Sequence, residues 1–526
     1  MRAYSDSVSK LRILSCIVVF GLTLTGCSST GPEPAAPVDA PPPLVPAMAL
    51  PDNAVDNAVA RLDGLAEELM EASGIPGMAV AVVHGAKTVY AKGFGVRDVR
   101  GDDPVDADTV FQLASVSKSM AATVVAHQVG IGSIDWDTPL VSELEGFALA
   151  DPAVTAMVTV GDMFAHRSGL PDHAGDKLED LGFDRRQVLQ RLRLLPLAPF
   201  RTSYAYTNFG LTAGAEAVAA AAGTDWEQLS ADVLYRPLGM TSTSSRYTDF
   251  VARPDRAVAH IRIDDGYRPL YERNADAQSP AGGVSSSVND VARWLAMVLA
   301  DGSYDGRRIV EPEALLPALT PQSVSERATE PAMRSGMYGY GFNVGQTSAG
   351  RVQLSHSGAF EIGVATSFAI LPSADVAIVV LTNATPTGVP ETLTAEFMDL
   401  VQFGEIRQNW RSLYTAALAS LSDPEGELVG RQPPADPAAA KALSEYVGVY
   451  HNDYWGPATV TEADGALTLA LGPDLVVGLQ HWDGDVFSFG LINENAPPGT
   501  ISRATFAGDR LTVEFYDDDG TGVFTR

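Results

Sequence analysis

Residues 352–383, VQLSHSGAFEIGVATSFAILPSADVAIVVLTN, decide the fold class of this chain. The stretch holds three runs rich in β-branched and apolar residues, at 352–355, 364–371 and 376–381, and each run predicts a strand. Another such run precedes them at 338–344. Four strands in such close succession predict a substantial sheet in this part of the chain.

The same sheet is expected to begin far upstream, at a hairpin. Residues 78–83 and 88–91 are β-rich and are separated by the turn-like sequence HGAK. Apolar periodicity predicts helices in between and just before, at 55–71, 111–129, 160–165, 185–194, 209–222, 226–235 and 287–299. Strands at both ends with helices between them predict an α/β body whose sheet is closed by its two termini.

A separate domain is expected at the C-terminal end. The sequence QPPADP at 432–437 is the clearest internal linker. Short strands at hairpin spacing follow it, at 446–450, 458–461, 466–471, 486–489, 505–506 and 511–515. This pattern predicts a small all-β C-terminal domain, which we expect to be a barrel.

Composition excludes several classes of protein. The 526 residues are 46% hydrophobic, so most of the chain can bury a core and fold. The formal net charge of −29 repels phosphate backbones and anionic lipid surfaces, which argues against a nucleic-acid partner. Both cysteines, Cys16 and Cys27, lie before the folded body, and the eight histidines include no His-Glu-x-x-His pair. We therefore expect no cofactor and no metal.

The first 26 residues predict a targeting segment. Lys10 and Arg12 precede an apolar run at 13–24 that is too short for a comfortable membrane span. The run ends in LTGC, which resembles a bacterial lipobox, so Cys27 is the expected lipidation site; an ordinary signal peptide is the alternative. A Ser-, Pro- and Ala-rich tether follows. We expect a protein held to the bacterial cell envelope by a lipid, on the periplasmic or extracellular side.

Ser115 and Lys118 are the first candidates for chemistry. They stand three positions apart at the start of the predicted helix, on the same face. A serine hydroxyl becomes a strong nucleophile when a base takes its proton, and a lysine whose pKa is lowered can be that base. The spacing alone is a weak signal, since Ser7 and Lys10 repeat the tetrapeptide SVSK in the targeting segment. A capped helix with a solvated lysine is the alternative.

Two further motifs support the pair. Tyr206 and Asn208 precede a predicted helix and offer a phenol that can relay a proton and an amide that can bind a carbonyl. The sequence HSG at 356–358 lies near a strand end. Competing matches are weaker, because 450–452 lies in the separate β domain and 173–175 does not follow a strand. Purely structural roles are the alternative for both motifs.

In this order, SxxK at 115–118, YxN at 206–208 and HxG at 356–358 resemble the three elements of the serine β-lactamase and penicillin-recognising hydrolase family, nearest to class C β-lactamases, D-stereospecific peptidases and related esterases. Other family-like stretches lie at 164–171, 237–240, 281–283 and 381–383. The resemblance implies a β-lactamase/DD-peptidase-like sheet flanked by helices. The expected division of the chain is a signal peptide at 1–26, a tether at 27–52, a hydrolase domain at 53–405, a helical and Pro-rich linker at 406–440 and a barrel at 441–526.

The resemblance also implies roles for the motif residues. Ser115 would be the acylated nucleophile, while Lys118 and Tyr206 would share its proton and pass it to the leaving group. Asn208 would orient the substrate. The backbone N–H groups of Ser115 and Ala359 would form the oxyanion hole.

His356, Ser357 and Gly358 would line the substrate site. His356 stands where many family members have a lysine, and this is the main departure from the family pattern. A histidine is largely neutral near pH 7 whereas a lysine is a fixed cation, so a grip on a substrate carboxylate is put in doubt.

The expected activity is that of a serine hydrolase acting through an acyl-enzyme on small esters, amides or D-amino-acid-containing peptides. A true β-lactamase is the alternative within the enzyme class, and an acyl-binding sensor or a scaffold with a vestigial site is the alternative outside it. The barrel is expected to cap the active-site cleft, with Tyr454, Trp455 and Trp482 as exposed aromatics, rather than to serve as a spacer.

Overall fold

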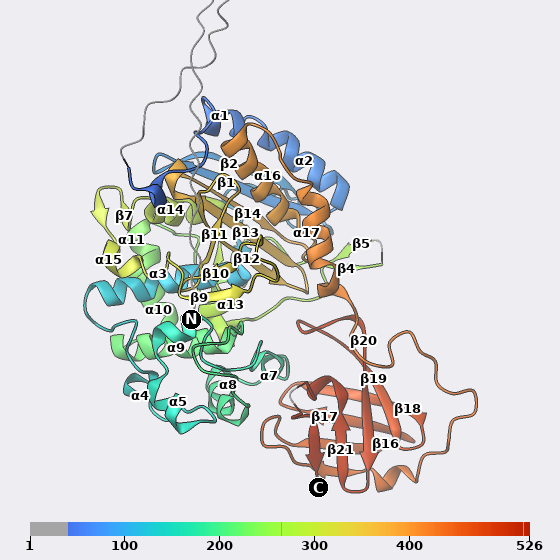
Figure 1. The fold of residues 1–526 in the computed structure, drawn as a ribbon. Coiled ribbons are helices and arrows are strands. Elements are labelled where there is room, and N and C mark those ends of the chain that lie inside the picture. Colours follow the sequence, from blue (N-terminus) through green and yellow to red (C-terminus); the bar gives the residue numbers. More distant parts are fainter. Residues whose placement is uncertain (1–39, 265, 519) are drawn as a thin grey trace, which may run out of the picture. The chain divides into compact units, whose positions relative to one another are not determined.

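The computed structural model describes residues 40–264, 266–518 and 520–526 (Figure 1). The expected signal peptide, Cys27 and most of the tether lie outside these residues. The chain forms two units, residues 1–45 and 46–526. The described part of the first unit contains the 3-10 turn η1 (Pro42–Leu44), and every element discussed below belongs to the second unit.

The central sheet has eight antiparallel strands within the described residues, in the order β2-β1-β14-β13-β12-β11-β10-β9. Their bounds are β1 (Gly77–His84), β2 (Lys87–Gly95), β9 (Ser323–Glu326), β10 (Gly336–Tyr338), β11 (Asn343–Gln346), β12 (Val352–Phe360), β13 (Val364–Leu371) and β14 (Val376–Thr382). β1 pairs with β14, with Met78 opposite Thr382. The predicted closure of the sheet by the two ends of the α/β body is confirmed.

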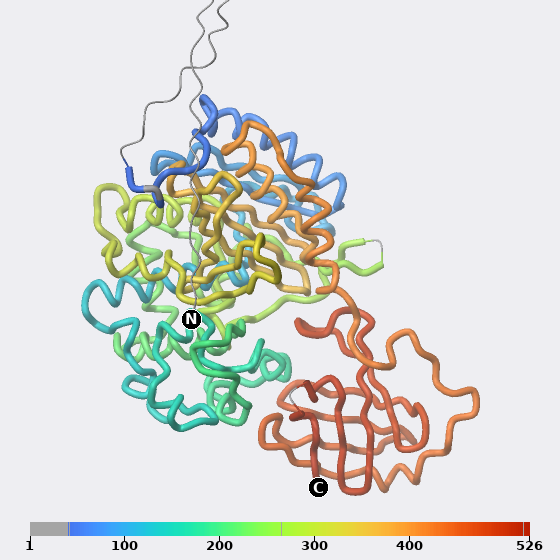
Figure 2. Tube along the Cα trace, viewed as in Figure 1, coloured from blue at the N-terminus to red at the C-terminus, as the bar shows by residue number. Residues whose placement is uncertain are grey.

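Helices cover both faces of this sheet. On one face lie α1 (Ala54–Val59), α2 (Leu62–Ser73) and α16 (Val389–Phe403), which Figure 2 shows side by side although they come from opposite ends of the α/β body. Val80 and Val82 of β1 are fully buried beneath them, and the alternate residues Ala79 and Ala81 face the other side. Because both faces are covered, β1 is apolar throughout rather than alternating.

The other face and the region beyond it hold the remaining helices of the α/β body. Their bounds are α3 (Ser117–Gly130), α4 (Leu140–Glu143), α5 (Pro152–Met157), α6 (Val160–Phe164), α7 (Asp176–Asp180), α8 (Arg185–Arg191), α9 (Asn208–Ala222), α10 (Trp226–Ser230), α11 (Arg236–Leu238), α12 (Tyr247–Val251), α13 (Ser279–Gly282), α14 (Val288–Leu299) and α15 (Pro312–Leu315). α14 packs on β1 and β14, where the small alanines of β1 allow a close approach.

Several predicted elements have different bounds in the structure, among them two helices and one strand of the α/β body. The helix expected at 55–71 is the pair α1 and α2, and the strand expected at 338–344 is β10 and β11, because Gly341 adopts a positive φ of 73° and turns the chain. The helix expected at 111–129 begins only at Ser117; before it come β3 (Phe111–Gln112), paired with β6 (Ser285–Ser286), and the 3-10 turn η2 (Ala114–Val116).

After α16, α17 (Trp410–Leu418) and η7 (Ala419–Ser422) lead to the C-terminal domain. That domain is a near-closed barrel of eight antiparallel strands in chain order, β15 (Gly448–Tyr450), β16 (Ala458–Ala463), β17 (Ala466–Leu471), β18 (Leu475–Asp483), β19 (Val486–Asn493), β20 (Ala496–Ala507), β21 (Arg510–Val513) and β22 (Val523–Thr525). A bridge between His451 and Thr525 brings its two ends together.

The expectation of exposed aromatics on the barrel is wrong for two residues. Tyr454 and Trp455 are only 6% and 4% exposed, because their rings pack edge to face against each other and Trp455 packs against Tyr516. Trp482 is half-buried. The buried aromatic rings therefore belong to the core of the barrel, together with buried leucines and phenylalanines such as Leu469 and Phe524.

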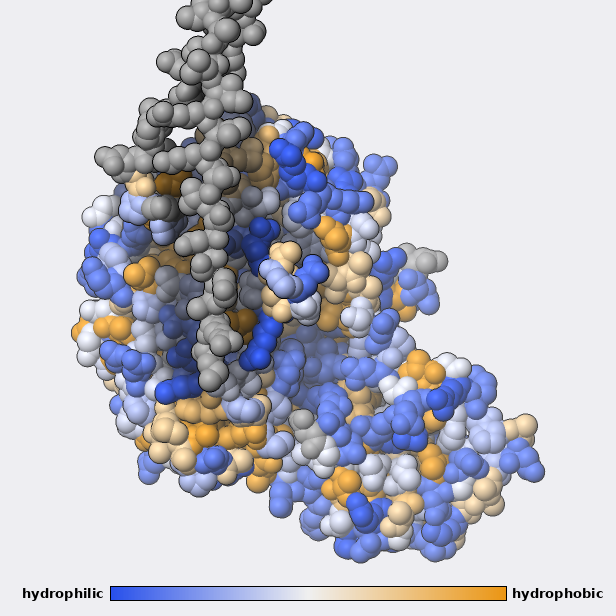
Figure 3. Space-filling view, in the orientation of Figure 1, coloured by the Kyte–Doolittle hydropathy of each residue, from blue (hydrophilic) through white to orange (hydrophobic). Residues whose placement is uncertain are grey.

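Hydrophilic residues cover most of the face shown in Figure 3. In the part of the chain that the structure describes, no helix is long and apolar enough to cross a membrane.

Candidate active site

Ser115 lies in η2, one turn ahead of α3 rather than inside that helix. The residue before it, Ala114, has a φ of 46°, which costs a residue with a side chain about 1 kcal/mol. Gly358 of β12 passes so close that an added Cβ would lie 2.9 Å from the Ser115 nitrogen and closer still to the carbonyl oxygen of Leu113. The turn that carries Ser115 is therefore in close contact with β12 at a position that requires glycine.

Lys118 is fully buried and contacts three oxygens. Its Nζ donates to Ser115 Oγ at 2.9 Å, to Asn208 Oδ1 at 2.6 Å and to the carbonyl oxygen of Ala281 at 2.9 Å. Burial lowers the pKa of Lys118 to about 7; Asp176 acts against this shift. A neutral amine has two N–H groups and one lone pair. If the two N–H groups stay on Asn208 and Ala281, the lone pair points at the Ser115 hydroxyl.

Tyr206 is the third group at the nucleophile. Its hydroxyl interacts with the Ser115 side chain, and Lys118 Nζ lies 4.6 Å from the centre of its ring. Burial raises the pKa of Tyr206 well above its ordinary value. The phenol therefore keeps its proton near pH 7 and can donate it, whereas Lys118 is the group able to accept one.

Asn208 is the first residue of α9, and its amide is engaged on both sides. Oδ1 accepts from Lys118, and Nδ2 donates to Asp176 Oδ2 at 2.7 Å. Asp176, the first residue of α7, also bonds His173 Nδ1 at 2.8 Å, which helps to raise the pKa of that histidine. Sequence analysis did not identify Asp176, and treated His173 only as a competing motif. The structure places both beside the motif residues.

His356 lies in β12 and is 4% exposed. Its Nε2 is 2.9 Å from the hydroxyl of Tyr338, and its Nδ1 is 2.6 Å from the carbonyl oxygen of Ser357. Burial, with a smaller contribution from Lys118, lowers the pKa of His356 to about 3. The imidazole is therefore neutral at physiological pH, and the lysine-like cation that many family members place here is missing at this position.

A cavity of about 250 Å³ opens at Ser115. It is lined by residues of several elements, namely Ser115, His173, Asp176, Tyr206, Asn208, Arg273, Gln278, Gly282, Ser357, Gly358, Ala359, Phe360, Pro386, Glu391, Leu418, Leu421, Glu494 and Asn495. All the predicted site residues of the described chain except Lys118 and His356, which lie behind its wall, are among them. A larger groove, of about 950 Å³, lies near α8 and contains none of the motif residues.

The C-terminal domain contributes to this cavity through the turn between β19 and β20. Glu494 in that turn forms an ion pair with Arg273 at 2.6 Å, and Asn495 Nδ2 donates to Asp180 Oδ2 at 2.7 Å. Arg273 also pairs with Glu179 at 2.6 Å. The expected contact between the barrel and the cleft is therefore present, but charged and amide side chains make it instead of aromatic ones.

Within the three described ranges, no group of three His, Cys, Asp or Glu residues is placed to hold a metal ion. The structure brings together the hydroxyl of Ser115, an amine of lowered pKa and a phenol that keeps its proton. These are the parts that acyl transfer to a serine requires.

The family model for β-lactamase matches residues 62–403. The chain belongs to the β-lactamase family. A second model, a domain of unknown function (DUF3471), matches residues 432–523, which contain the near-barrel. Together with the site geometry, the family assignment makes the protein a β-lactamase-related serine hydrolase.

The relatives of this β-lactamase-family chain include several kinds of hydrolase. It is 27% identical over 456 residues to the unguisins hydrolase ungD of Aspergillus violaceofuscus (strain CBS 115571), covering 79% of this chain and 80% of the relative. It is 28% identical over 284 residues to esterase EstB of Burkholderia gladioli, covering 47% and 71%. Its fold resembles the octameric penicillin-binding protein homologue of Pyrococcus abyssi, with a TM-score of 0.57 and 19% identity over 89% of this chain and 100% of that one.

Proposed function

We propose that this protein is an envelope-anchored serine hydrolase that acts through an acyl-enzyme on small esters, amides or D-amino-acid-containing peptides. The observation that carries the proposal is the 2.9 Å contact between Lys118 Nζ and Ser115 Oγ, made by an amine whose pKa is about 7. About half of the molecules then hold a neutral base on the nucleophile at neutral pH.

In the proposed reaction, Ser115 Oγ attacks the carbonyl carbon of the substrate while its proton moves to the neutral Lys118 amine. The N–H groups of Ser115 and Ala359 stabilise the oxyanion. Tyr206 gives its proton to the leaving group as the tetrahedral intermediate collapses, and the Lys118 ammonium returns a proton to Tyr206. Water then attacks the acyl-enzyme by the reverse proton route, which frees Ser115 and releases the acid product.

The relatives support hydrolysis without fixing the substrate. One is named a hydrolase of unguisins and another an esterase. The neutral His356 favours these classes over β-lactams, whose carboxylate would find no lysine at this position. Steady turnover of a chromogenic cephalosporin would instead favour a true β-lactamase.

A fluorescent phosphonate tests the proposed nucleophile directly. The wild-type protein should be labelled covalently and Ser115→Ala should not, while Ser142→Ala, which removes an exposed hydroxyl on α4, should be labelled at the wild-type rate. Labelled wild-type protein that fails to hydrolyse esters, anilides or D-amino-acid amides would favour an acyl-binding sensor. Unlabelled wild-type protein would contradict the proposal.

The envelope anchor is proposed from the sequence LTGC at 24–27 and the tether that follows. A body of net negative charge gains nothing from anionic headgroups, so the lipid on Cys27 would hold it at the membrane. Cys27→Ala should move the protein to the soluble fraction and change its electrophoretic mobility. Cys16→Ala, in the segment that is removed with the signal peptide, should change neither. Membrane association unaffected by Cys27→Ala would refute the anchor.

A further inference from the structure

One carboxylate in the active-site cavity has no positively charged partner. Glu391 is the third residue of α16 and is 9% exposed, yet it lines the same cavity as Ser115. Among the described residues no lysine, arginine or histidine nitrogen lies within 4 Å of its carboxylate, and its Oε2 has no hydrogen-bond partner. Its carboxyl group does interact with the hydroxyl of Ser357, on the strand next to Gly358.

The cations near the cavity are already neutralised. Arg273 is paired with Glu179 and Glu494, each at 2.6 Å. Lys118 has lost much of its charge to burial, and His356 is neutral. His173, the remaining basic residue of the cavity wall, is bonded to Asp176 at 2.8 Å, so each basic group of the described cavity lining has a partner other than Glu391.

A buried carboxylate without a counter-ion is costly unless hydrogen bonds satisfy both of its oxygens. Burial accordingly raises the pKa of Glu391 to about 7. The position of Glu391 in the first turn of α16 partly explains why a buried carboxylate is tolerated there, because the positive end of the helix dipole stabilises an acidic side chain. It does not explain why one oxygen is left without a partner at a cavity that contains the nucleophile. A cation entering from solvent would supply the missing partner.

We propose that Glu391 binds a primary ammonium group of the substrate, so that the enzyme selects amine-bearing esters, amides or peptides over substrates that carry a carboxylate. The inference rests on the proposed function, since it concerns the substrate of Ser115. The ammonium donates to Glu391 Oε2 and to Ser357 Oγ, which lies beside it. Leu418 and Leu421, which line the same cavity, provide an apolar surface for the carbon chain that bears the amine.

Substrates that differ only in charge test this selectivity. The p-nitroanilides of D-alanine, L-alanine, β-alanine and 4-aminobutyrate would be compared with their N-acetyl and N-succinyl forms, which carry no charge and a negative charge. The wild-type protein should show the highest kcat/KM on at least one free amine, a lower value on its acetylated form and the lowest on its succinylated form. Wild-type protein that hydrolyses acetylated anilides as well as the free amines would overturn the inference.

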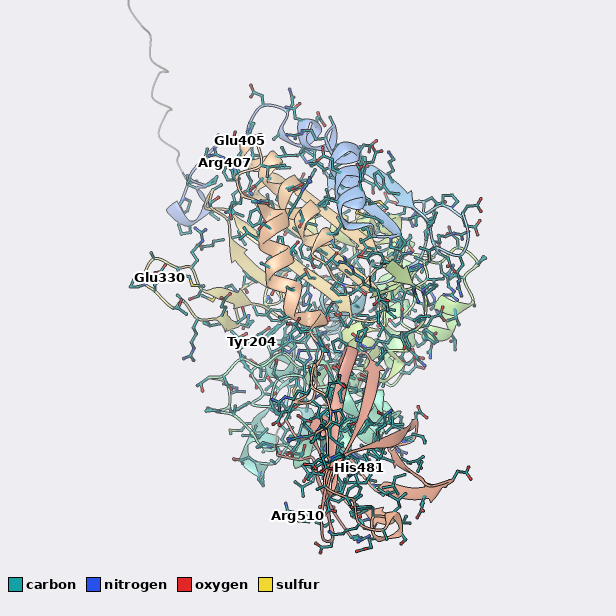
Figure 4. The ribbon with its side chains drawn as sticks, turned by 90° about the vertical axis from the view of Figure 1, so that its right-hand side faces the viewer. Tyr204, Glu330, Glu405, Arg407, His481 and Arg510 are labelled. Atoms are coloured by element: carbon teal, nitrogen blue, oxygen red, sulfur yellow. The ribbon has the colours of Figure 1, made fainter. Side chains whose placement is uncertain are left out.

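Variants assign the selectivity to Glu391. Glu391→Gln should lower the preference for the free amine over the acetylated form by about 10- to 100-fold, the value of a charge-assisted hydrogen bond. Glu391→Lys should favour the succinylated form, and Glu391→Asp should retain part of the wild-type preference. The control is Glu330→Gln, because Glu330 is exposed on a loop that points away from the body (Figure 4), and it should behave as wild type.

Phosphonate labelling of Ser115 distinguishes a failure of the proposed function from a failure of the role proposed for Glu391. If the wild-type protein is not labelled, the proposed function fails. If Glu391→Gln is labelled at the wild-type rate and keeps the wild-type preference for the amine, the hydrolase stands and the role of Glu391 is refuted. Should Glu391→Gln not fold, the charge series on the wild-type protein and the Glu391→Asp variant still decide the question.

Discussion

pH is the most informative perturbation of the proposed mechanism, since Lys118 can act as a base only when it is neutral. Burial brings its pKa to about 7 from an ordinary value of 10.5. At ~1.36 kcal/mol per pH unit, this difference means that the charged amine is about 5 kcal/mol less favourable in the folded protein than in water, relative to the neutral amine. The three contacts of Nζ, all with uncharged groups, provide no counter-ion that would offset it.

The assay is kcat/KM for an uncharged p-nitrophenyl ester from pH 5 to pH 9, corrected for spontaneous hydrolysis. The rate should rise about tenfold per pH unit below pH 7 and become constant above it. Lys118→Ala should lose this inflection and fall by about 10²- to 10⁴-fold. A wild-type profile that is flat, or that still rises about tenfold per pH unit up to pH 9 without levelling off, would refute the reasoning, as would full activity in Lys118→Ala.

The same lysine makes stability depend on pH, with a defined sign. Between about pH 7 and 10.5 the unfolded lysine is protonated while the folded one is not, so the unfolded state binds more protons and stability rises with pH. Lys118→Met removes this dependence. The free energy of unfolding of the wild type relative to Lys118→Met should therefore increase by about 2 kcal/mol from pH 7 to pH 9 in urea denaturation.

Three further substitutions probe the surroundings of the nucleophile. Tyr206→Phe should lower kcat by about 10²- to 10⁴-fold, and its combination with Lys118→Ala should be little worse than the poorer single variant, because residues that move one proton together are not additive. Gly358→Ala should destabilise the fold by about 1–3 kcal/mol and slow phosphonate labelling, since the new methyl group would press on the Ser115 turn; thermal denaturation and labelling rates measure the two effects. Glu494→Gln should shift the inflection of kcat/KM slightly toward lower pH, because burial raises the pKa of Glu494 to about 8, so that this carboxyl offsets only part of the Arg273 charge near pH 7; a shift toward higher pH would contradict this coupling.

The sheet and the order of the motifs could be predicted because short, continuous stretches of sequence determine both. Apolar runs such as 364–371 and 376–381 must be strands buried on both faces, and the motif residues stand on or beside such elements. The start of α3 could not be predicted, since the positive φ of Ala114 is imposed by β12 packing against the turn and leaves no sign in the sequence. The site prediction brought together Ser115, Lys118 and Tyr206, because they stand in short local motifs whose order along the chain resembles that of a known family.

No pattern in the sequence predicted the charged residues of the cavity wall. Arg273, Glu391 and Glu494 are separated by about a hundred residues each along the chain and belong to unrelated elements. No periodicity or turn pattern marks them, so they read as ordinary surface charges. Only the folded structure shows that two of them neutralise each other and that the third is left without a partner.

A short series of polar groups connects the turn between β19 and β20 to Lys118. Glu494 and Asn495 bind Arg273 and Asp180, and Asp180 is the last residue of α7. The first residue of that helix is Asp176, which holds the Asn208 amide whose oxygen accepts from Lys118. Asp176 and Arg273 act in opposite directions on the pKa of Lys118. The barrel therefore supplies both lining and charge to the cavity: Glu494 partly offsets Arg273, which lowers the pKa of Lys118, and in the proposed mechanism this helps to hold that pKa close to 7.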